Sequence, residues 1–262
     1  MNKAETREKD IMALLRVSGK VSVAEAMALL DVSESTVRRL FNKLEADGLA
    51  VRTYRGISIN AVCGTRESYS FERNELYRSN EKITIGEAAE KLIEEGDTLY
   101  LDSGTTVLRL CSAMARAAGG GGEKYSTVTV FTNSLANLNL LKDHMNVCLI
   151  GGEYRPHRQD FCGYLTDEVI KKLHFTKCFV GADGYSVDNG LTASDFDTAR
   201  INQLVVACSD KRILLADTSK AGRASVIHYA PIESIDTLVT NKWLDANTKA
   251  ELLKKNINVI EA

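Results

Sequence analysis

The chain has 262 residues, of which 44% are hydrophobic and 26% charged, and it carries a formal net charge of -2 at pH 7. These proportions are ordinary for soluble globular proteins, and no stretch approaches the roughly 18 uninterrupted apolar residues that a membrane span needs. The composition therefore excludes a membrane-embedded protein. Because a typical domain has about 100 to 150 residues, the length predicts two domains of unequal size.

The amino-terminal sequence MNKAETREKD is charged and lacks the apolar segment and the small-residue cleavage site of a secretory signal, so we expect a cytoplasmic protein. The six cysteines include no C-x-x-C pair, which favours buried free thiols over a redox or metal role. We expect neither a metal ion nor a cofactor.

Two short helices are predicted at the start of the chain. Residues 6–17 place Ile11, Leu14 and Leu15 on one face. The next helix begins with a capping box, in which Ser22 and Glu25 each satisfy a backbone amide, and it ends before the turn at residues 31–33.

A third helix is predicted over residues 34–47, with Ser33 as its cap and an apolar stripe that includes Val37, Phe41 and Leu44. Its outward positions carry Arg, Asn, Ser, Thr and Lys. Arginine and asparagine suit the edges of guanine and adenine, whereas Ser, Thr and Lys suit phosphates. Two helices, a turn and a polar third helix form the geometry that inserts into a DNA major groove.

After this helix, residues 49–58 alternate like two strands around a glycine-containing turn, as in the wing of a winged helix. The alternative is a three-helix protein–protein module with a solvated charged face, which the full order of elements disfavours. The predicted DNA-contacting residues are Ser33, Ser35, Thr36, Arg38, Arg39, Asn42, Lys43, Arg52 and Arg55.

Polar and charged residues dominate residues 61–80, which we expect to be a linker between domains. We therefore expect a DNA-binding domain at residues 1–60 and a second domain at 81–262.

In the second domain, short apolar runs alternate with helical patterns, which predicts an α/β fold with a largely parallel sheet covered on both sides. The expected strands are residues 98–101, 128–132, 146–150, 177–180, 212–216 and 235–240, with a further strand near Val259.

Ligands of such sheets bind beyond the carboxyl ends of the strands. Five polar loops are expected there, at residues 102–106, 132–134, 151–155, 181–184 and 217–220. The first, Asp102 to Thr106, opens a helix whose amides and dipole favour an anion. Any one of these loops could be a simple turn or helix cap, but five at corresponding ends favour a pocket. The predicted effector-binding residues are Asp102, Ser103, Gly104, Thr105, Thr106, Thr132, Asn133, Ser134, Gly151, Gly152, Arg155, Arg158, Asp183, Gly184 and Lys220.

The charges of this set suit a phosphorylated sugar. Lys220, Arg155 and Arg158 can neutralise a phosphate, while Asp102 and Asp183 can hydrogen-bond hydroxyl groups.

The segment VSVAEAMALLDVSESTVRRLFNKLEADGLAVRTYRG resembles the helix-turn-helix of the DeoR family of bacterial sugar-metabolism regulators. LDSGTT, FTNS, IGGEYRP, VGADG and LLADTSK resemble its sensor domain, so the likeness extends over about residues 3–260. The resemblance implies a sensor fold like that of ribose-5-phosphate isomerase, and a repressor, usually dimeric or tetrameric, that releases its DNA operator when a phosphorylated sugar binds.

The chain departs from the family pattern at four places, one of which is an insertion at residues 119–124 that we expect to be a surface loop without a role. Leu40 stands where an acidic residue usually follows the paired arginines, and residues 54–56 replace a His-Gly-Gly of the wing. Residues 197–203 lack the basic pair that is common in a helix of the sensor.

The alternative function is a sugar-phosphate isomerase with an appended DNA-binding head, because fold alone does not determine function. Asp183 could be its base, but residues 187–190 lack the lysine that the similar isomerases carry after this loop. The four histidines are isolated, and no catalytic triad or dinucleotide motif is present. We therefore predict no catalytic residues. A scaffold that only oligomerises would need neither the basic helix nor the polar loops.

Overall fold

The structure, a computed structural model, describes residues 3–18, 20–46, 50–53, 56–59 and 70–262. It divides the chain into two units, Met1–Leu76 and Tyr77–Ala262. None of the helices formed by the described residues is long and apolar enough to span a lipid bilayer.

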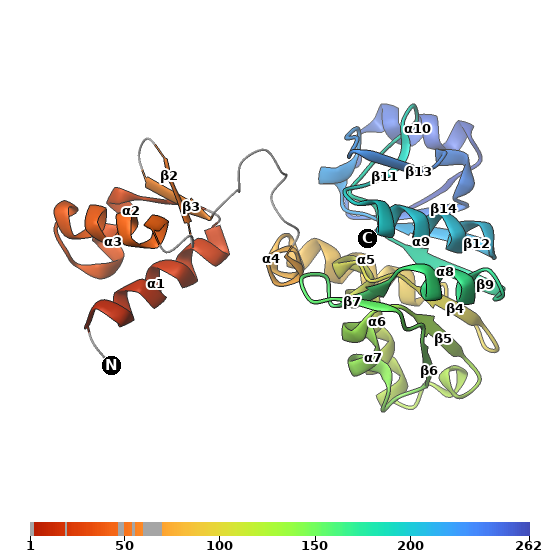
Figure 1. Ribbon diagram of the computed structural model, residues 1–262. Helices are drawn as coiled ribbons and strands as arrows, with labels where there is room; N and C mark the ends of the chain where they lie inside the picture. The colour runs from red at the N-terminus through yellow and green to blue at the C-terminus, as the bar shows by residue number, and fades with distance from the viewer. Residues whose placement is uncertain (1–2, 19, 47–49, 54–55, 60–69) are drawn as a thin grey trace. The chain divides into compact units, whose positions relative to one another are not determined.

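The first unit contains helices and a small sheet (Figure 1). Its elements are α1 Lys3–Ser18, β1 Lys20–Ser22, α2 Val23–Leu30, α3 Glu34–Ala46, β2 Ala50–Thr53, β3 Gly56–Ile59 and α4 Phe71–Leu76. The capping box before α2 is present, and α2 ends where Asp31 adopts a left-handed conformation with φ 50°. A buried cluster that includes Ile11, Phe41 and Ile57 holds the helices against the strands.

The hairpin formed by β2 and β3 is antiparallel, as predicted for a wing. A third strand, β1, was not expected from the sequence, and it pairs with β3. A Cβ at Gly56 would lie 2.1 Å from the carbonyl oxygen of Val21, so this close pairing requires glycine.

The second unit is built on a seven-stranded sheet in the order β15-β14-β12-β9-β4-β5-β6, and all of its paired strands are parallel. The prediction of a parallel α/β sheet is confirmed. The strands are β4 Thr98–Leu101, β5 Thr129–Thr132, β6 Asn146–Leu149, β9 Phe175–Val180, β12 Ser209–Leu215, β14 Thr237–Thr240 and β15 Asn258–Glu261.

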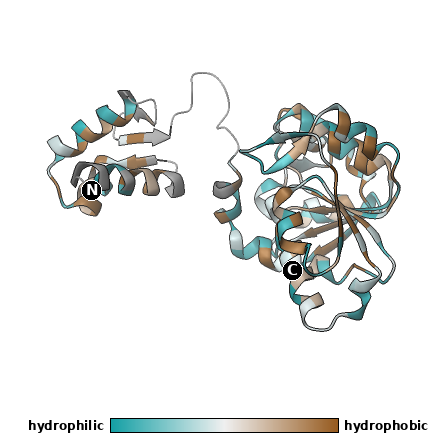
Figure 2. Ribbon diagram, turned by 60° about the horizontal axis from the view of Figure 1, so that its bottom comes forward, coloured by the Kyte–Doolittle hydropathy of each residue, from teal (hydrophilic) through white to brown (hydrophobic). Residues whose placement is uncertain are grey.

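Helices cover both faces of this sheet (Figure 1). On one face lie α5 Ser79–Glu90, α6 Thr105–Gly119 and α7 Leu135–Leu141, and on the other lie α8 Tyr164–Ile170, α9 Phe196–Ala207 and α10 Ala246–Lys254. Side chains alternate between the two layers. Leu99 and Leu101 of β4 pack with the first group, whereas Tyr100 packs with the second. Figure 2 shows the resulting hydrophobic strands between helices whose outer faces are hydrophilic.

Two small antiparallel sheets and three short 3-10 helices complete this unit. The sheets consist of β7 Glu153–Arg155 with β8 Asp160–Cys162, and of β10 Gly184–Ser186, β11 Gly190–Ala193 and β13 Ile227–Ala230. The 3-10 helices are η1 Glu123–Ser126, η2 Thr218–Lys220 and η3 Ile232–Ser234. The sequence analysis placed residues 153–155 in a loop, but they form a strand.

Candidate functional site

Helix α3 presents a polar face to solvent. Arg38, Arg39, Asn42 and Lys43 are exposed, while Val37, Phe41 and Leu44 are buried. Arg38 forms an ion pair with Glu34 of the same helix at 2.6 Å, and Lys43 forms one with Glu8 of α1. Exposed ion pairs of this kind stabilise a fold by only about 0–1 kcal/mol, so both cations can exchange these partners for groups of a bound molecule at little cost.

Three hydroxyl groups lie together where α3 begins. The Ser33 Oγ is 3.0 Å from the Ser35 Oγ and 3.1 Å from the Thr36 Oγ1. In the wing, Arg52 lies in β2 opposite Ile57 of β3, whereas Arg55 lies outside the described residues.

The five predicted loops all follow carboxyl ends of parallel strands, namely β4, β5, β6, β9 and β12. The chain fills the sheet from β4 towards β6 and then continues on the other side of β4 with β9. The point where the order reverses is where open α/β sheets bind ligands. The two loops at this point touch, because the Gly181 amide donates a 3.0 Å hydrogen bond to Asp102 Oδ2.

Asp102 is held in a buried position by backbone groups. Its Oδ1 accepts a second hydrogen bond, of 2.7 Å, from the Ser103 amide. Burial raises the pKa of Asp102 and outweighs the opposite effect of the two amides, and the neighbouring Asp160 raises this pKa further. This carboxyl group is therefore more easily protonated than that of an exposed aspartate.

The sequence analysis did not identify Lys82, which lies at the first loop. This lysine of α5 is only 3% exposed, and its Nζ donates a 3.0 Å hydrogen bond to the Thr105 hydroxyl. Thr105 begins α6, and Gly104 is the cap, so no side chain covers the first amides of the helix. An ammonium group and a helix amino terminus thus make this loop electropositive.

The second loop is tightly built into the protein. Asn133 accepts a 2.9 Å hydrogen bond from the Tyr100 hydroxyl and donates one of 2.8 Å to the Phe161 carbonyl. The Thr132 hydroxyl donates to the Leu101 carbonyl, and Ser134 Oγ caps α7 by accepting from the Asn137 amide. In this structure these side chains hold β5 to β4 and to β8.

A charge network joins the third loop to α9. Arg155 makes a bidentate ion pair with the fully buried Asp160, at 2.8 and 2.7 Å. Its third nitrogen contacts Asp195 Oδ1 at 2.7 Å, and Arg158 contacts Asp195 Oδ2 at 2.6 Å. Ser103 joins the network through a 2.8 Å hydrogen bond to Asp160. Asp160 and Asp195 were also missed by the sequence analysis.

The charge network shifts the pKa values of Arg155 and Asp195. Burial lowers the pKa of Arg155, but Asp160 and Asp195 more than offset this and raise it. Burial raises the pKa of Asp195, but the Thr198 amide, Arg158 and Arg155 together lower it below its usual value. Asp195 therefore stays ionised between two guanidinium groups.

The fourth and fifth loops follow β9 and β12, at the same carboxyl ends of the strands. Lys220 Nζ donates a 2.5 Å hydrogen bond to the Ala182 carbonyl, and Asp183 accepts a 2.7 Å bond from the Ser194 amide. Gly151 and Gly152 are exposed, and Gly184 is the first residue of β10. The structure thus brings the charged residues of the predicted set together with Lys82, Asp160 and Asp195.

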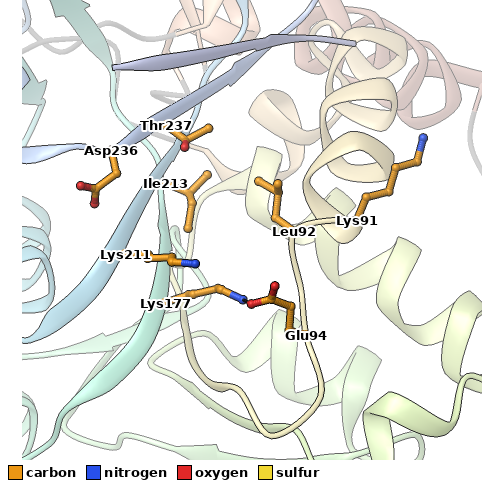
Figure 3. Close-up of a pocket in the computed structure, with 8 residues that line it drawn as sticks. All are labelled: Lys91, Leu92, Glu94, Lys177, Lys211, Ile213, Asp236 and Thr237. Carbon is orange, nitrogen blue, oxygen red and sulfur yellow. Dashed lines mark hydrogen bonds and ion pairs between the residues drawn. The ribbon is translucent and has the colours of Figure 1, made fainter. Parts of the chain in front are cut away.

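A separate pocket of about 420 Å³ lies at the amino-terminal ends of the strands, opposite the five loops (Figure 3). Lys177, Lys211 and Thr237 lie in the amino-terminal halves of their strands, and none of the predicted effector residues lines this pocket. Lys177 points to Glu94, at 2.5 Å, and also contacts Asp97 at 2.7 Å.

Within the described residues, no group of three or more His, Cys, Asp or Glu side chains could hold a metal ion. All four histidines are exposed. Five of the six cysteines are described, and these five are free.

Two family models match the chain. The DeoR-like helix-turn-helix domain matches residues 7–62, and the DeoR C terminal sensor domain matches residues 77–242. The chain is 32% identical over 246 residues to a lactose phosphotransferase system repressor of Lactococcus lactis subsp. lactis, with 93% of each protein covered. It is 31% identical over 230 residues to the HTH-type transcriptional regulator IolR of Bacillus subtilis (strain 168), with 87% of each covered.

Among solved structures, ribose 5-phosphate isomerase A of Methanocaldococcus jannaschii aligns with a TM-score of 0.40 and 16% identity, covering 55% of this chain and 54% of that one. The two family models lie in the order of the two structural units, and the relatives align along nearly the whole chain. The chain therefore belongs to the DeoR family of DNA-binding transcriptional regulators.

Proposed function

We propose that this regulator represses sugar-utilisation genes and leaves its operator when a phosphorylated sugar binds at the carboxyl edge of the sheet. The observation that carries the proposal is the continuous network of charged side chains across the loops at the switch point, from Ser103 through Asp160, Arg155 and Asp195 to Arg158. A relative named as a lactose phosphotransferase system repressor supports the class of effector.

DNA contact is assigned to residues 1–60. In this proposal Arg38, Arg39 and Asn42 of α3 meet base edges, while Lys43 and the Ser33, Ser35 and Thr36 hydroxyls meet phosphates. Arg52 and Arg55 of the wing contact a neighbouring phosphate or the minor groove. Residues 61–80 link this head to an effector-sensing domain at 81–262, and such a regulator works in the cytoplasm.

We assign the phosphate of the effector to Arg155 and Arg158, the two arginines of the charge network. Arg155 and Arg158 share the carboxylate of Asp195, which has the charge and the paired oxygens that a phosphate offers. The amides that open α6, together with Lys220, add donors at the same edge. Asp102 and Asp183 are assigned to the sugar hydroxyls, because carboxylates accept hydrogen bonds from them.

The first test is a thermal-shift screen of the purified protein against sugar phosphates and the corresponding unphosphorylated sugars. A ligand that binds only the native state raises the melting temperature, by an amount that grows with its concentration. We expect one phosphorylated sugar to raise it selectively and to release operator DNA in a gel-shift assay. No shift across the panel would contradict the proposed effector site.

The matched variants are Asp102→Ala and Lys220→Ala. Both should still bind operator DNA but respond weakly to the effector. If the effector releases operator DNA from both variants as it does from the wild type, the effector binds elsewhere.

The isomerase alternative predicts turnover of the bound sugar phosphate. We propose a sensor without turnover, and the relatives' names as transcriptional regulators support this choice. In addition, Asp183, the candidate base, accepts a 2.7 Å hydrogen bond from the Ser194 amide, so one of its oxygens is engaged with the backbone. Chromatographic separation of the aldose and ketose phosphates after prolonged incubation decides between the two, because an isomerase changes their ratio and a sensor does not.

A further inference from the structure

The pocket at the amino-terminal ends of the strands lies between the sheet and the segment that follows α5 (Figure 3). Its volume of about 420 Å³ is within the range of roughly 300–1,000 Å³ that small-molecule sites have. Residues of the sheet line one side, and residues after α5 line the other. The residues used below are Lys177 of β9, Lys211 and Ile213 of β12, Thr237 of β14, and Leu92 and Glu94 after α5.

Two lysines lie side by side in this pocket. Lys177 and Lys211 are register partners in the parallel pair of β9 and β12, so their side chains leave the sheet on the same face. Figure 3 shows both ammonium groups directed towards Glu94. Neighbouring strands lie about 4.8 Å apart, so the two like charges repel each other unless anions offset them.

Lys177 is held by two carboxylates and stays charged. It is 4% exposed, and its Nζ contacts Asp97 at 2.7 Å and Glu94 at 2.5 Å. Burial lowers the pKa of Lys177, but the hydrogen bonds to Asp97 and Glu94 more than offset this and raise it. An ammonium group has three N–H donors, and these two contacts use two of them. Among the residues that the structure describes, the third donor has no acceptor.

Lys211 has no such partners. It is exposed, and it forms no hydrogen bond or ion pair with the described part of the chain. Asp236, which also lines the pocket, is engaged by the Arg212 guanidinium at 2.9 and 3.0 Å. Three lysines and two acidic residues line the pocket, which leaves an excess of one positive charge. The pocket therefore favours an anion, and Lys211 is the cation that has no counterion.

The part of the pocket next to the lysines is apolar. Figure 3 shows Leu92 and Ile213 facing each other from the two sides. Ile213 is 3% exposed, and both residues belong to the hydrophobic cluster that α5 and α6 cover. Thr237, the register partner of Ile213, adds one hydroxyl group. A sugar phosphate is polar on every side and would leave the two apolar side chains unmatched, whereas a ring or a short hydrocarbon chain would cover them.

We propose that this pocket binds a small carboxylate that carries an apolar ring or chain. The carboxylate accepts hydrogen bonds from Lys211 and from the remaining donor of Lys177, and the apolar part lies between Leu92 and Ile213. This site is distinct from the proposed effector site, whose loops lie at the carboxyl ends of the strands. The chain thus has a second small-molecule site for a ligand of different chemistry.

Glu94 competes with such a ligand for the two lysines. Its side chain is 70% exposed. The hydrogen bond from Lys177 lowers the pKa of Glu94, and the charges of Lys177 and Lys211 lower it further. Replacing Glu94 with glutamine removes the competing charge, while Asp97 still neutralises Lys177. Substitutions at Lys211 and Glu94 should therefore change the affinity for a carboxylate in opposite directions.

The probe is benzoate at pH 7, where it is ionised, and the experiment is a ligand-observed NMR titration of the full chain. Benzamide is the first comparison, because it has the same shape without the charge. Inorganic phosphate is the second, because it has charge without an apolar part. We expect benzoate to bind several-fold more tightly than either.

The Lys211→Met variant should bind benzoate about two- to fivefold more weakly than the wild type, and Glu94→Gln should bind it more tightly by a similar factor, because each change alters one exposed ion pair. Lys91→Met is the matched control. Lys91 lines the same pocket, but Figure 3 shows its ammonium group directed away from Lys177 and Lys211, so the affinity should stay close to that of the wild type. All three substituted side chains are exposed, so the melting temperatures should stay close to wild type as well.

The absence of benzoate binding would overturn the proposal, and so would equal dissociation constants for benzoate and benzamide. Equal losses in Lys211→Met and Lys91→Met would indicate general attraction of anions and would also overturn it. A sugar phosphate that displaces benzoate would place benzoate at the carboxyl ends of the strands, against the proposal. If benzoate behaves as expected but no sugar phosphate raises the melting temperature, the proposed effector fails while this site stands.

Discussion

The ammonium group of Lys82 lies 3.0 Å from the hydroxyl of Thr105, and this contact joins the first helix of the sensor unit to the loop that opens α6. Lys82 is almost fully buried. A buried cation at a helix amino terminus favours an anion at the same place, because both features contribute positive potential. We therefore propose Lys82 as a further residue of the effector site, one that the predicted set lacked.

Replacing Lys82 with methionine keeps the length of the side chain and removes its charge. A hydrogen bond to a charged group contributes about 1.5–3 kcal/mol, so we expect the sugar phosphate to bind about ten- to a hundredfold more weakly. Isothermal titration calorimetry with the sugar phosphate selected in the thermal-shift screen measures the dissociation constant of each variant. Lys91→Met, at an exposed position just after the same helix, is the control, and operator affinity should be unchanged in both. Equal effector affinity in the two variants would remove Lys82 from the site.

Arg38→Ala and Arg39→Ala should each weaken operator binding. A good bidentate contact to a base contributes about 1–3 kcal/mol of discrimination, so the expected loss is roughly five- to 150-fold. Fluorescence anisotropy with labelled operator gives the two dissociation constants, while the thermal shift by the effector should remain that of the wild type. Arg116→Ala, an exposed arginine of α6, controls for general electrostatic attraction. Wild-type operator affinity in both α3 variants would exclude α3 as the reading helix.

Asp195→Asn tests the charge network through its dependence on pH. Asparagine is as good a helix cap as aspartate, so the cap of α9 is kept while the charge is lost. The pKa of Asp195 is lowered in the folded protein below its ordinary value of 3.8. The ionised group therefore stabilises the fold above that value, and the stabilisation is lost as the pH falls through the lowered pKa.

We accordingly expect the variant to melt at a lower temperature than the wild type at pH 7, with a difference that shrinks below about pH 3.8. Differential scanning calorimetry across this range measures it. A difference that stays constant from pH 7 to pH 3 would show that the charge of Asp195 contributes nothing.

Gly152→Ala should destabilise the sensor unit, whereas Gly151→Ala should not. A Cβ at Gly152 would lie 2.2 Å from the Thr166 hydroxyl and 2.4 Å from the Cys162 carbonyl, but one at Gly151 would meet nothing within 4 Å. Overpacking of this kind costs about 1–3 kcal/mol. Urea unfolding of the two variants gives the free energies directly, and equal values would contradict the close approach of the third loop to α8.

The sequence was informative wherever a local pattern determined the structure. Apolar runs located the seven parallel strands, because strands buried on both faces need continuous hydrophobic residues. The Ser22 and Glu25 capping box was recognised for the same reason, since its two contacts span three residues.

The missed features depend on contacts between distant parts of the chain. Lys82 sits within an ordinary helical pattern, and its partner lies 23 residues away. Asp160 meets Ser103 across 57 residues, and Asp195 meets Arg155 across 40. The strands β7 and β8 have three residues each, too few for an alternating pattern to be read. The sequence alone therefore predicted the loops of the candidate site but not the acidic residues that position its arginines.

The wing and α3 belong to one packed body within the amino-terminal unit. Strands β2 and β3 of the wing join β1, which leads directly into α2, and the buried cluster that includes Phe41 of α3 also includes Ile57 of β3. The spacing between the two groups of residues proposed to contact DNA is therefore fixed by the fold of this unit. An operator that both groups can reach must match that spacing.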